Sequence, residues 1–305
     1  MNRVPGSGGG GAPSGGGSRP PGARGPVPSE VVGVFGGGGA KAAAHAGAFR
    51  ALEEAGLVPG RYVGTSMGAA FAAMFAAGLS GCEALDRVSA VAGREVVRTE
   101  RVSLVKGLWA RHLLKPGPFR EALARLVPVR RFDALRVPLT VTATDLESGE
   151  LVLFGAEGRD VPLLDALYAS AALPLFFPPL ELEGRRYADG GLRAVLPLAP
   201  AARFPAALVA AVDVGPGFDE PPPAGGSGLP PLVELHNEVT GILMAGQTAL
   251  TVAAWRGDPA RPRLLYIRPR LERGATFKVD QVRRYAELGY AAARDALAGL
   301  QSEAR

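Results

Sequence analysis

Short apolar runs and longer mixed stretches follow one another from residue 31 onward. A run of about five apolar residues that is rich in valine and bounded by glycine is typical of a buried strand. A longer stretch that ends at a glycine, such as Gly56 or Gly78, is typical of a helix. The first strand, helix, strand and helix are predicted at 31–35, 40–55, 62–65 and 67–77. This order predicts the opening of a parallel α/β sheet.

Weaker signals of the same kind continue to the end of the chain. Further strands are predicted at 138–143, 151–154, 208–214 and 264–268, with a hairpin of 180–183 and 186–188 around Gly184. Further helices are predicted at 82–92, 119–127, 163–170, 232–255 and 279–297. A loop rich in proline and glycine is expected at 215–231. No internal repeat and no second clear linker is visible, so we expect one domain over 30–300.

The first 29 residues differ in composition from the rest of the chain. They are mostly Gly, Pro, Ser and Arg and contain almost nothing that could be buried. Such a segment cannot offset the conformational entropy lost on ordering, so we expect a disordered tail at 1–29. The tail lacks the apolar stretch of a secretory signal. No apolar run in the sequence is long enough to span a bilayer. These features favour a cytoplasmic protein, with membrane contact from that side as a further option.

Composition narrows the classes of function. Of the 305 residues, 47% are hydrophobic, which suits a globular core, and the formal net charge is +5. No run of Lys or Arg interleaved with aromatic residues indicates a nucleic-acid groove. Cys82 is the only cysteine, which excludes an intramolecular disulfide and a cysteine metal cluster. An arginine-rich surface could favour an anionic membrane face, although a biased but ordinary surface is the simpler interpretation.

The strongest local signal is Gly64-Thr65-Ser66-Met67-Gly68, at a predicted junction of strand and helix. A nucleophile on such a sharp turn needs strained backbone angles and leaves no room for side chains two positions away. The turn also places the serine at a helix N-terminus, which favours developing negative charge. A tight turn with a capping serine is the alternative interpretation.

A second signal is the run Gly36-Gly37-Gly38-Gly39-Ala40-Lys41, again between a strand and a helix. Successive glycines can aim several N–H groups at one point, as an oxyanion hole requires. A Walker phosphate loop is excluded because Lys41 is not followed by Ser or Thr. A dinucleotide fingerprint can be forced, but the second strand does not end in a ribose-binding acid. A purely structural turn remains an alternative.

The third signal is Asp189-Gly190-Gly191, just past the predicted hairpin. An acid beside flexible backbone could serve as a base. On its own, however, Asp-Gly is more simply a turn.

Taken together, these motifs resemble those of the patatin-like phospholipase family, over residues 31–295. The matching segments are the glycine loop 37–41, the stretch 48–56, the elbow 64–69, the segments 169–174 and 177–179, and the acid motif 187–191. The resemblance implies a three-layer α/β/α sandwich with a central, mainly parallel sheet. It further implies a serine acyl hydrolase that acts on lipid esters without a metal or another cofactor.

The resemblance also assigns roles to individual residues. Ser66 would be the nucleophile and Asp189 its base, and the N–H groups of Gly37, Gly38 and Gly39 would bind the oxyanion. Supporting positions are Lys41, Gly64, Gly68 and Gly190. Three departures from the family pattern stand out: Lys41 where Arg is more frequent, Ala42 where Gly is usual, and Arg193-Ala194-Val195-Leu196-Pro197 without the frequent asparagines. None of them removes a reacting group.

Other residues leave alternatives open. His236 could complete a Ser66, Asp189 and histidine triad, as in an ordinary serine hydrolase. His45 is expected to pack or hydrogen-bond behind the glycine loop, and His112 lies in an irregular basic stretch. The segment 104–119 has apolar residues rimmed by basic ones and could cover a lipid site, or simply cover the sheet. An acyltransferase and a non-catalytic lipid-binding protein of the same fold are the alternative functions.

Overall fold

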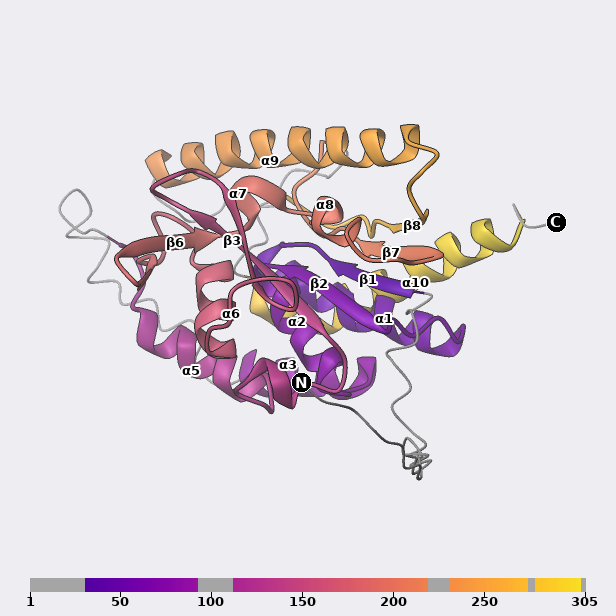
Figure 1. The fold of residues 1–305 in the computed structure, drawn as a ribbon, viewed down its shortest axis with the longest axis horizontal. Coiled ribbons are helices and arrows are strands. Elements are labelled where there is room, and N and C mark those ends of the chain that lie inside the picture. Colours follow the sequence, from indigo (N-terminus) through magenta and orange to yellow (C-terminus); the bar gives the residue numbers. More distant parts are fainter. Residues whose placement is uncertain (1–30, 93–111, 219–230, 274–277, 303–305) are drawn as a thin grey trace, which may run out of the picture.

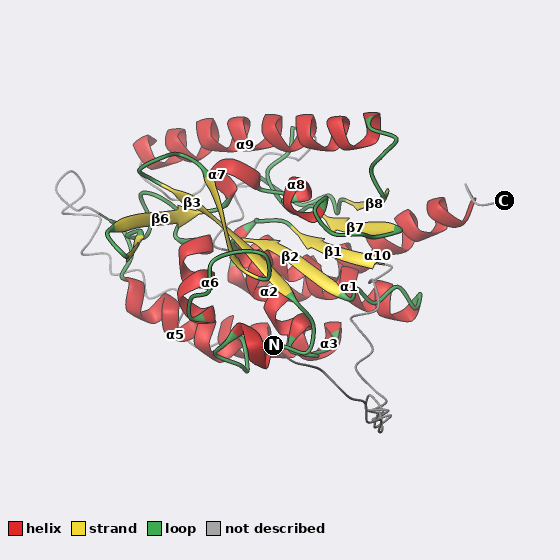
Figure 2. Ribbon diagram, in the orientation of Figure 1, coloured by secondary structure: helices red, strands yellow, loops and turns green. Residues whose placement is uncertain are grey.

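The computed structural model describes residues 31–92, 112–218, 231–273 and 278–302 (Figure 1). The tail expected at 1–29 lies outside these ranges, as does the first half, 104–111, of the segment considered as a cover for a lipid site. Helices surround a central sheet in the described part of the chain (Figure 2).

Five parallel strands form the centre of the sheet, and three antiparallel strands extend it at one side. The parallel strands run in the order β3 (Leu139–Asp145), β2 (Arg61–Thr65), β1 (Val31–Phe35), β7 (Leu208–Val212) and β8 (Arg263–Ile267). The antiparallel strands are β4 (Leu151–Gly155), β5 (Leu180–Leu182) and β6 (Arg185–Asp189). The predicted mainly parallel sheet is confirmed.

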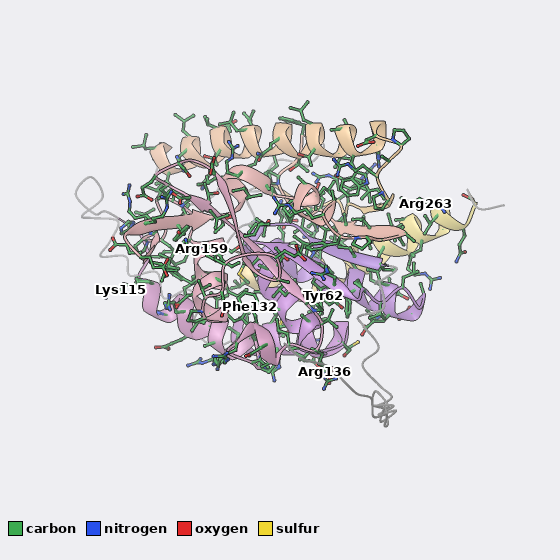
Figure 3. All side chains as sticks on the ribbon, in the orientation of Figure 1. Tyr62, Lys115, Phe132, Arg136, Arg159 and Arg263 are labelled. Atoms are coloured by element: carbon green, nitrogen blue, oxygen red, sulfur yellow. The ribbon has the colours of Figure 1, made fainter. Side chains whose placement is uncertain are left out.

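Helices cover both faces of this sheet, which gives three layers (Figure 1). Along β1, Val32 and Val34 pack into one hydrophobic cluster, whereas Phe35 packs into the other. The larger layer holds α1 (Ala44–Glu54), α2 (Met67–Ala76), α3 (Gly81–Ala92), α5 (Pro116–Leu126), α6 (Leu163–Ala171) and α10 (Val282–Ser302). The other layer holds α7 (Gly191–Ala194), α8 (Leu198–Ala201) and α9 (Pro231–Gly257). Side chains such as Tyr62 fill the space between the layers (Figure 3).

The order of pairing along β3 brings the ends of two strands together. Residues 140–142 of β3 pair with both β2 and β4, so β2 and β4 lie on opposite edges of β3. Residues 143 and 144 pair with both β4 and β6, so β6 also lies opposite β4. Strands β2 and β6 therefore lie end to end on one edge of β3. Because β6 is antiparallel to β3, the carboxyl ends of β2 and β6 meet.

The structure differs from the local predictions at several places. The helix predicted at 40–55 is wrong in its first turn, where η1 (Gly39–Ala43) forms a 3-10 helix before α1 begins. The short helices α7 and α8 were not predicted, since four residues are too few to show a helical period. Among the described helices, none is both long and apolar enough to cross a membrane.

Candidate active site

Ser66 lies in the turn between β2 and α2 and has φ of 55° and ψ of −134°. A positive φ is uncommon for a residue with a side chain and stores strain. The turn is also tightly packed. A Cβ at Gly64 would lie 2.5 Å from the Cα of Ala69, and one at Gly68 would lie 2.3 Å from the carbonyl oxygen of Gly36. The two glycines are therefore required for the close approach of the backbone on either side of Ser66.

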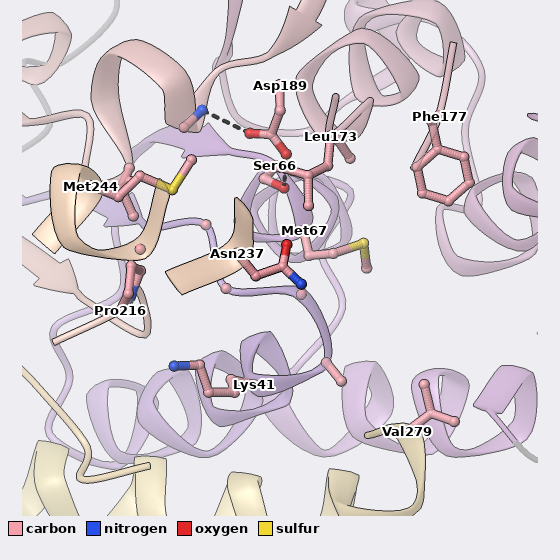
Figure 4. A pocket seen from close by; sticks show the side chains of 18 of the residues that line it. Lys41, Ser66, Met67, Leu173, Phe177, Asp189, Pro216, Asn237, Met244 and Val279 are labelled. Atoms are coloured by element: carbon pink, nitrogen blue, oxygen red, sulfur yellow. Dashed lines mark hydrogen bonds between the residues drawn. The ribbon is translucent and has the colours of Figure 1, made fainter. Parts of the chain in front are cut away.

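Asp189, the last residue of β6, contacts Ser66 directly (Figure 4). The hydroxyl of Ser66 donates to Oδ2 of Asp189 at 2.7 Å. The other carboxylate oxygen, Oδ1, accepts the N–H of Gly191 at 2.7 Å. Both oxygens thus have partners, and the carboxylate faces the hydroxyl without an intervening histidine.

Burial changes the acidity of Asp189. Its side chain is only 4% exposed. Desolvation raises the pKa of Asp189 to about 6, although hydrogen bonds from the Gly191 N–H and from Ser66 act in the opposite direction. A carboxylate with a pKa near 6 is still mostly ionised at neutral pH and is a stronger base than an exposed aspartate. The geometry therefore lets Asp189 accept the proton of Ser66.

Ser170 on α6 links the two halves of this site, a role that the sequence interpretation did not assign. Its hydroxyl accepts the N–H of Ser66 at 2.8 Å, and its carbonyl oxygen accepts the N–H of Gly190 at 3.1 Å. Ser170 is fully buried. The signal in the sequence was the resemblance of segment 169–174 to the family, which indicated the segment but not this contact.

Threonines hold the two strand ends on β3. The hydroxyls of Thr65 and Thr142 lie 2.6 Å apart, and Thr65 also donates to the carbonyl oxygen of Ala194 at 2.8 Å. Thr144 donates to the carbonyl oxygen of Asp189 at 2.9 Å. A Cβ at Gly190 would lie 2.5 Å from Oγ1 of Thr142, so this glycine lets β6 approach the threonines.

The glycine loop lies against Ser66, but its donors differ from the expectation in one respect. The N–H of Gly37 donates to the carbonyl oxygen of Val195 at 2.9 Å. The assignment of Gly37 as an oxyanion donor is therefore corrected, since its N–H already has an acceptor. The N–H groups of Gly38 and Gly39 have no acceptor within the described part of the chain. Gly37 instead provides space, because a Cβ there would lie 3.1 Å from Cβ of Ser66.

Two buried basic side chains support the loop from behind. His45 makes a hydrogen bond of 2.8 Å through Nε2 to the carbonyl oxygen of Gly36. Burial lowers the pKa of His45 to about 4, so the ring is neutral near pH 7 and Nε2–H is the donor. The expected hydrogen bond behind the glycine loop is confirmed. Lys41 is 4% exposed, and its Nζ donates to the carbonyl oxygen of Gly215 at 3.5 Å.

A buried ion pair fixes the segment on which the glycine loop rests. Asp213 follows β7, and its Oδ2 accepts the Tyr266 hydroxyl and Nη1 of Arg268, each at 2.6 Å. Its Oδ1 accepts the N–H of Gly215 at 3.0 Å. A Cβ at Gly38 would lie 2.5 Å from the carbonyl oxygen of Val214, so loop and segment are in close contact. Asp213 thus stabilises the position of the loop from the far side.

A cavity of about 880 Å³ opens onto Ser66 and Asp189. Its inner side is apolar and comes from the helical layer, with side chains of Val88, Val91, Phe119, Leu123, Leu126 and Phe177. Its other side is formed by the first half of α9, which contributes His236, Asn237, Glu238 and Thr240. Asn237 and Met244 of α9 appear with Ser66 and Lys41 in Figure 4. The site therefore combines a reactive pair with space for an apolar chain.

The histidines do not join the reactive pair. His236 is an exposed residue of the cavity wall. Within the described ranges, no histidine makes a hydrogen bond to Asp189, whose oxygens contact Ser66 and Gly191. The alternative triad of Ser66, Asp189 and His236 is therefore not formed. No group of three or more His, Cys, Asp or Glu side chains in the described part of the chain could hold a metal ion.

The profile of a family described as patatin-like phospholipase matches residues 33–202, more than half of the chain. An uncharacterized NTE family protein of Mycobacterium tuberculosis is 34% identical over 204 residues, which cover 65% of this chain and 54% of the relative. Lysophospholipase NTE1 of Coccidioides immitis is 26% identical over 282 residues, which cover 88% of this chain and 18% of the relative. The chain thus spans about half the length of the mycobacterial relative.

Among solved structures, VipD of Legionella pneumophila aligns with a TM-score of 0.42 and 13% identity. The alignment covers 89% of this chain and 67% of that chain.

Proposed function

Because the chain belongs to the patatin-like phospholipase family, we propose that it is a serine acyl hydrolase that cleaves ester bonds of lipids. The observation that carries the proposal is the hydrogen bond of 2.7 Å from Ser66 Oγ to the buried carboxylate of Asp189. A carboxylate in direct contact with the hydroxyl can act as its base, so Ser66 and Asp189 would form a dyad.

The first half of the reaction forms an acyl-enzyme. Oγ of Ser66 attacks the ester carbonyl carbon while Asp189 takes the hydroxyl proton. The N–H groups of Gly38 and Gly39 would stabilise the oxyanion of the tetrahedral intermediate, assisted by the N-terminus of α2. Asp189 then gives the proton to the leaving alcohol as the bond between carbonyl carbon and alcohol oxygen breaks.

The second half of the reaction releases the acid. Asp189 takes a proton from water, the hydroxide oxygen attacks the acyl carbon, and the proton returns to Oγ of Ser66 as the acyl–serine bond breaks. The apolar side of the cavity, including Phe119 and Phe177, would bind the acyl chain. The name of the Coccidioides relative, a lysophospholipase, supports a lipid ester as substrate.

Transfer of the acyl group to an alcohol other than water is the alternative, because it uses the same acyl-enzyme. Labelling by a fluorophosphonate tests both reactions. We expect wild-type protein to be labelled and Ser66→Ala not to be labelled. A folded wild-type protein that resists labelling would refute the catalytic function and favour a binding protein. A panel of esters and phospholipids with an added acceptor alcohol would then separate hydrolysis from transfer.

A further inference from the structure

The outer face of α9 carries a continuous row of exposed apolar side chains. Leu232, Leu235, Val239, Leu243 and Leu250 are each between 49% and 74% exposed. They are spaced by three, four, four and seven residues, which places them on one face of the helix. The row extends over about 27 Å at a rise of 1.5 Å per residue. The helix itself runs along one edge of the molecule (Figure 1). We call these five residues the apolar row.

An exposed apolar surface of this extent indicates a binding surface rather than ordinary scatter of single side chains. The charges of α9 argue against binding by electrostatic attraction to an anionic surface. The helix has no Lys or Arg before Arg256, and its N-terminal half carries the acids Glu234 and Glu238. Attraction to an anionic surface would require positively charged side chains on this helix. Apolar contact is therefore the interaction that the row can offer.

The apolar row continues into the cavity that holds Ser66. Ile242, next to Leu243 in the chain, is 51% exposed and also lines the cavity. Phe218, in the segment after β7, is 60% exposed and lines the cavity as well. Apolar side chains are thus shared between the exposed surface near the apolar row and the wall of the cavity that holds Ser66.

We propose that α9 docks the protein on the surface of a zwitterionic lipid layer, with the apolar row inserted at the boundary of head groups and acyl chains. The proposal rests on the proposed lipid acyl hydrolase function. Interfacial helices bind lipid through an apolar face in the same way, and many add Lys or Arg to bind anionic lipid. A second copy of the chain fits the row less well, because it would cover Ile242, a residue of the cavity wall, without supplying a lipid.

The test uses a triple variant, Leu232→Gln with Leu235→Gln and Leu243→Gln. None of the three leucines lines the cavity, and glutamine is a good helix former. The matched control is Val58→Gln, a residue that is 54% exposed and precedes β2 at the end of the sheet opposite the cavity. Binding is measured by flotation with phosphatidylcholine vesicles, at low and at high salt, in proteins that also carry Ser66→Ala.

We expect the Ser66→Ala protein, which is the parent of the other variants, to bind the vesicles at both salt concentrations, and the control to do the same. The triple variant should lose about tenfold or more in the ratio of bound to free protein, because three large apolar side chains no longer leave water. With Ser66 restored, the triple variant should keep its turnover of a soluble short-chain ester and lose turnover of the vesicle-borne ester.

Three outcomes would overturn the proposal: a parent protein that does not bind phosphatidylcholine vesicles, a triple variant that binds as well as the parent, or a parent dimer in sedimentation that the triple variant dissociates. The proposed catalytic function fails separately, if wild-type protein does not hydrolyse the soluble ester. In that case vesicle binding that depends on the row would still support docking.

Discussion

Replacing Asp189 by asparagine should abolish turnover and at the same time stabilise the folded protein at neutral pH. Burial raises the pKa of Asp189 from 3.8 to about 6, so the folded protein holds a proton that the unfolded chain has already released. The free energy of unfolding therefore falls as the pH rises between these two values. A shift of about two pKa units corresponds to a cost of about 3 kcal/mol, fully present above about pH 7 and absent below about pH 3.

The asparagine variant avoids this cost because its side chain is uncharged at every pH. Its amide oxygen can accept the Gly191 N–H, and its NH2 group can donate to Ser66 Oγ, so both contacts of the carboxylate can be kept with an uncharged group. Hydrogen bonds to an uncharged group are weaker, which reduces the gain, so we expect Asp189→Asn to be about 1 to 3 kcal/mol more stable than wild type at pH 7.5.

Denaturant unfolding of both proteins between pH 4 and 7.5 measures this difference. The advantage of the variant should grow with pH and become constant above about pH 7. Asp86→Asn, at an exposed position on α3, is the matched control. A difference between Asp189→Asn and wild type that is the same at every pH would refute the reasoning, as would a variant that retains turnover.

Four further predictions concern catalysis and the tail. The turnover of wild type should fall about tenfold from pH 7 to pH 5, because only about a tenth of Asp189 stays ionised one unit below its pKa; a flat pH–rate profile would contradict its role as base. Ser170→Ala removes the acceptor of the Ser66 N–H and should lower kcat on the order of tenfold with little change in KM, and unchanged steady-state kinetics would argue against this positioning role. His236→Ala should keep turnover within about tenfold of wild type; a folded variant as inactive as Ser66→Ala would overturn the dyad. Deletion of residues 1–29 should leave the melting temperature and ester turnover nearly unchanged, and a large drop in a thermal scan would show that the tail docks on the domain.

Features that depend on neighbours in the chain were predictable from the sequence. The buried strands β1, β2 and β7 follow from short apolar runs, and the turn at Ser66 follows from glycines two positions away on either side. The clash of a Cβ at Gly64 or Gly68 with nearby backbone explains why both positions are glycine. Such local constraints require particular residue types at neighbouring positions and can therefore be recognised in the sequence.

Features that depend on distant residues were not predictable in this way. The N–H of Gly37 is engaged by Val195, and the hydroxyl of Ser170 accepts the N–H of Ser66, 104 residues away. Neither partner carries a local signal. The helix at 232–255 was predicted, but it is apolar on several sides. Only packing on the sheet decides that Val252 and Trp255 are buried while Leu243 and Leu250 are exposed.

The end-to-end arrangement of β2 and β6 on one edge of β3 has a consequence for folding. Ser66 and Asp189 are 123 residues apart in the chain, and they meet only where both strands have paired with β3. A chain that has formed β1, α1, β2 and α2 alone would contain Ser66 but would not yet have Asp189 beside it. Contacts between such distant residues form late, because the closure of a long loop must come first. If the proposed dyad is correct, partly folded chains would have no turnover, and a newly made protein would acquire it only when β2 and β6 have both paired with β3.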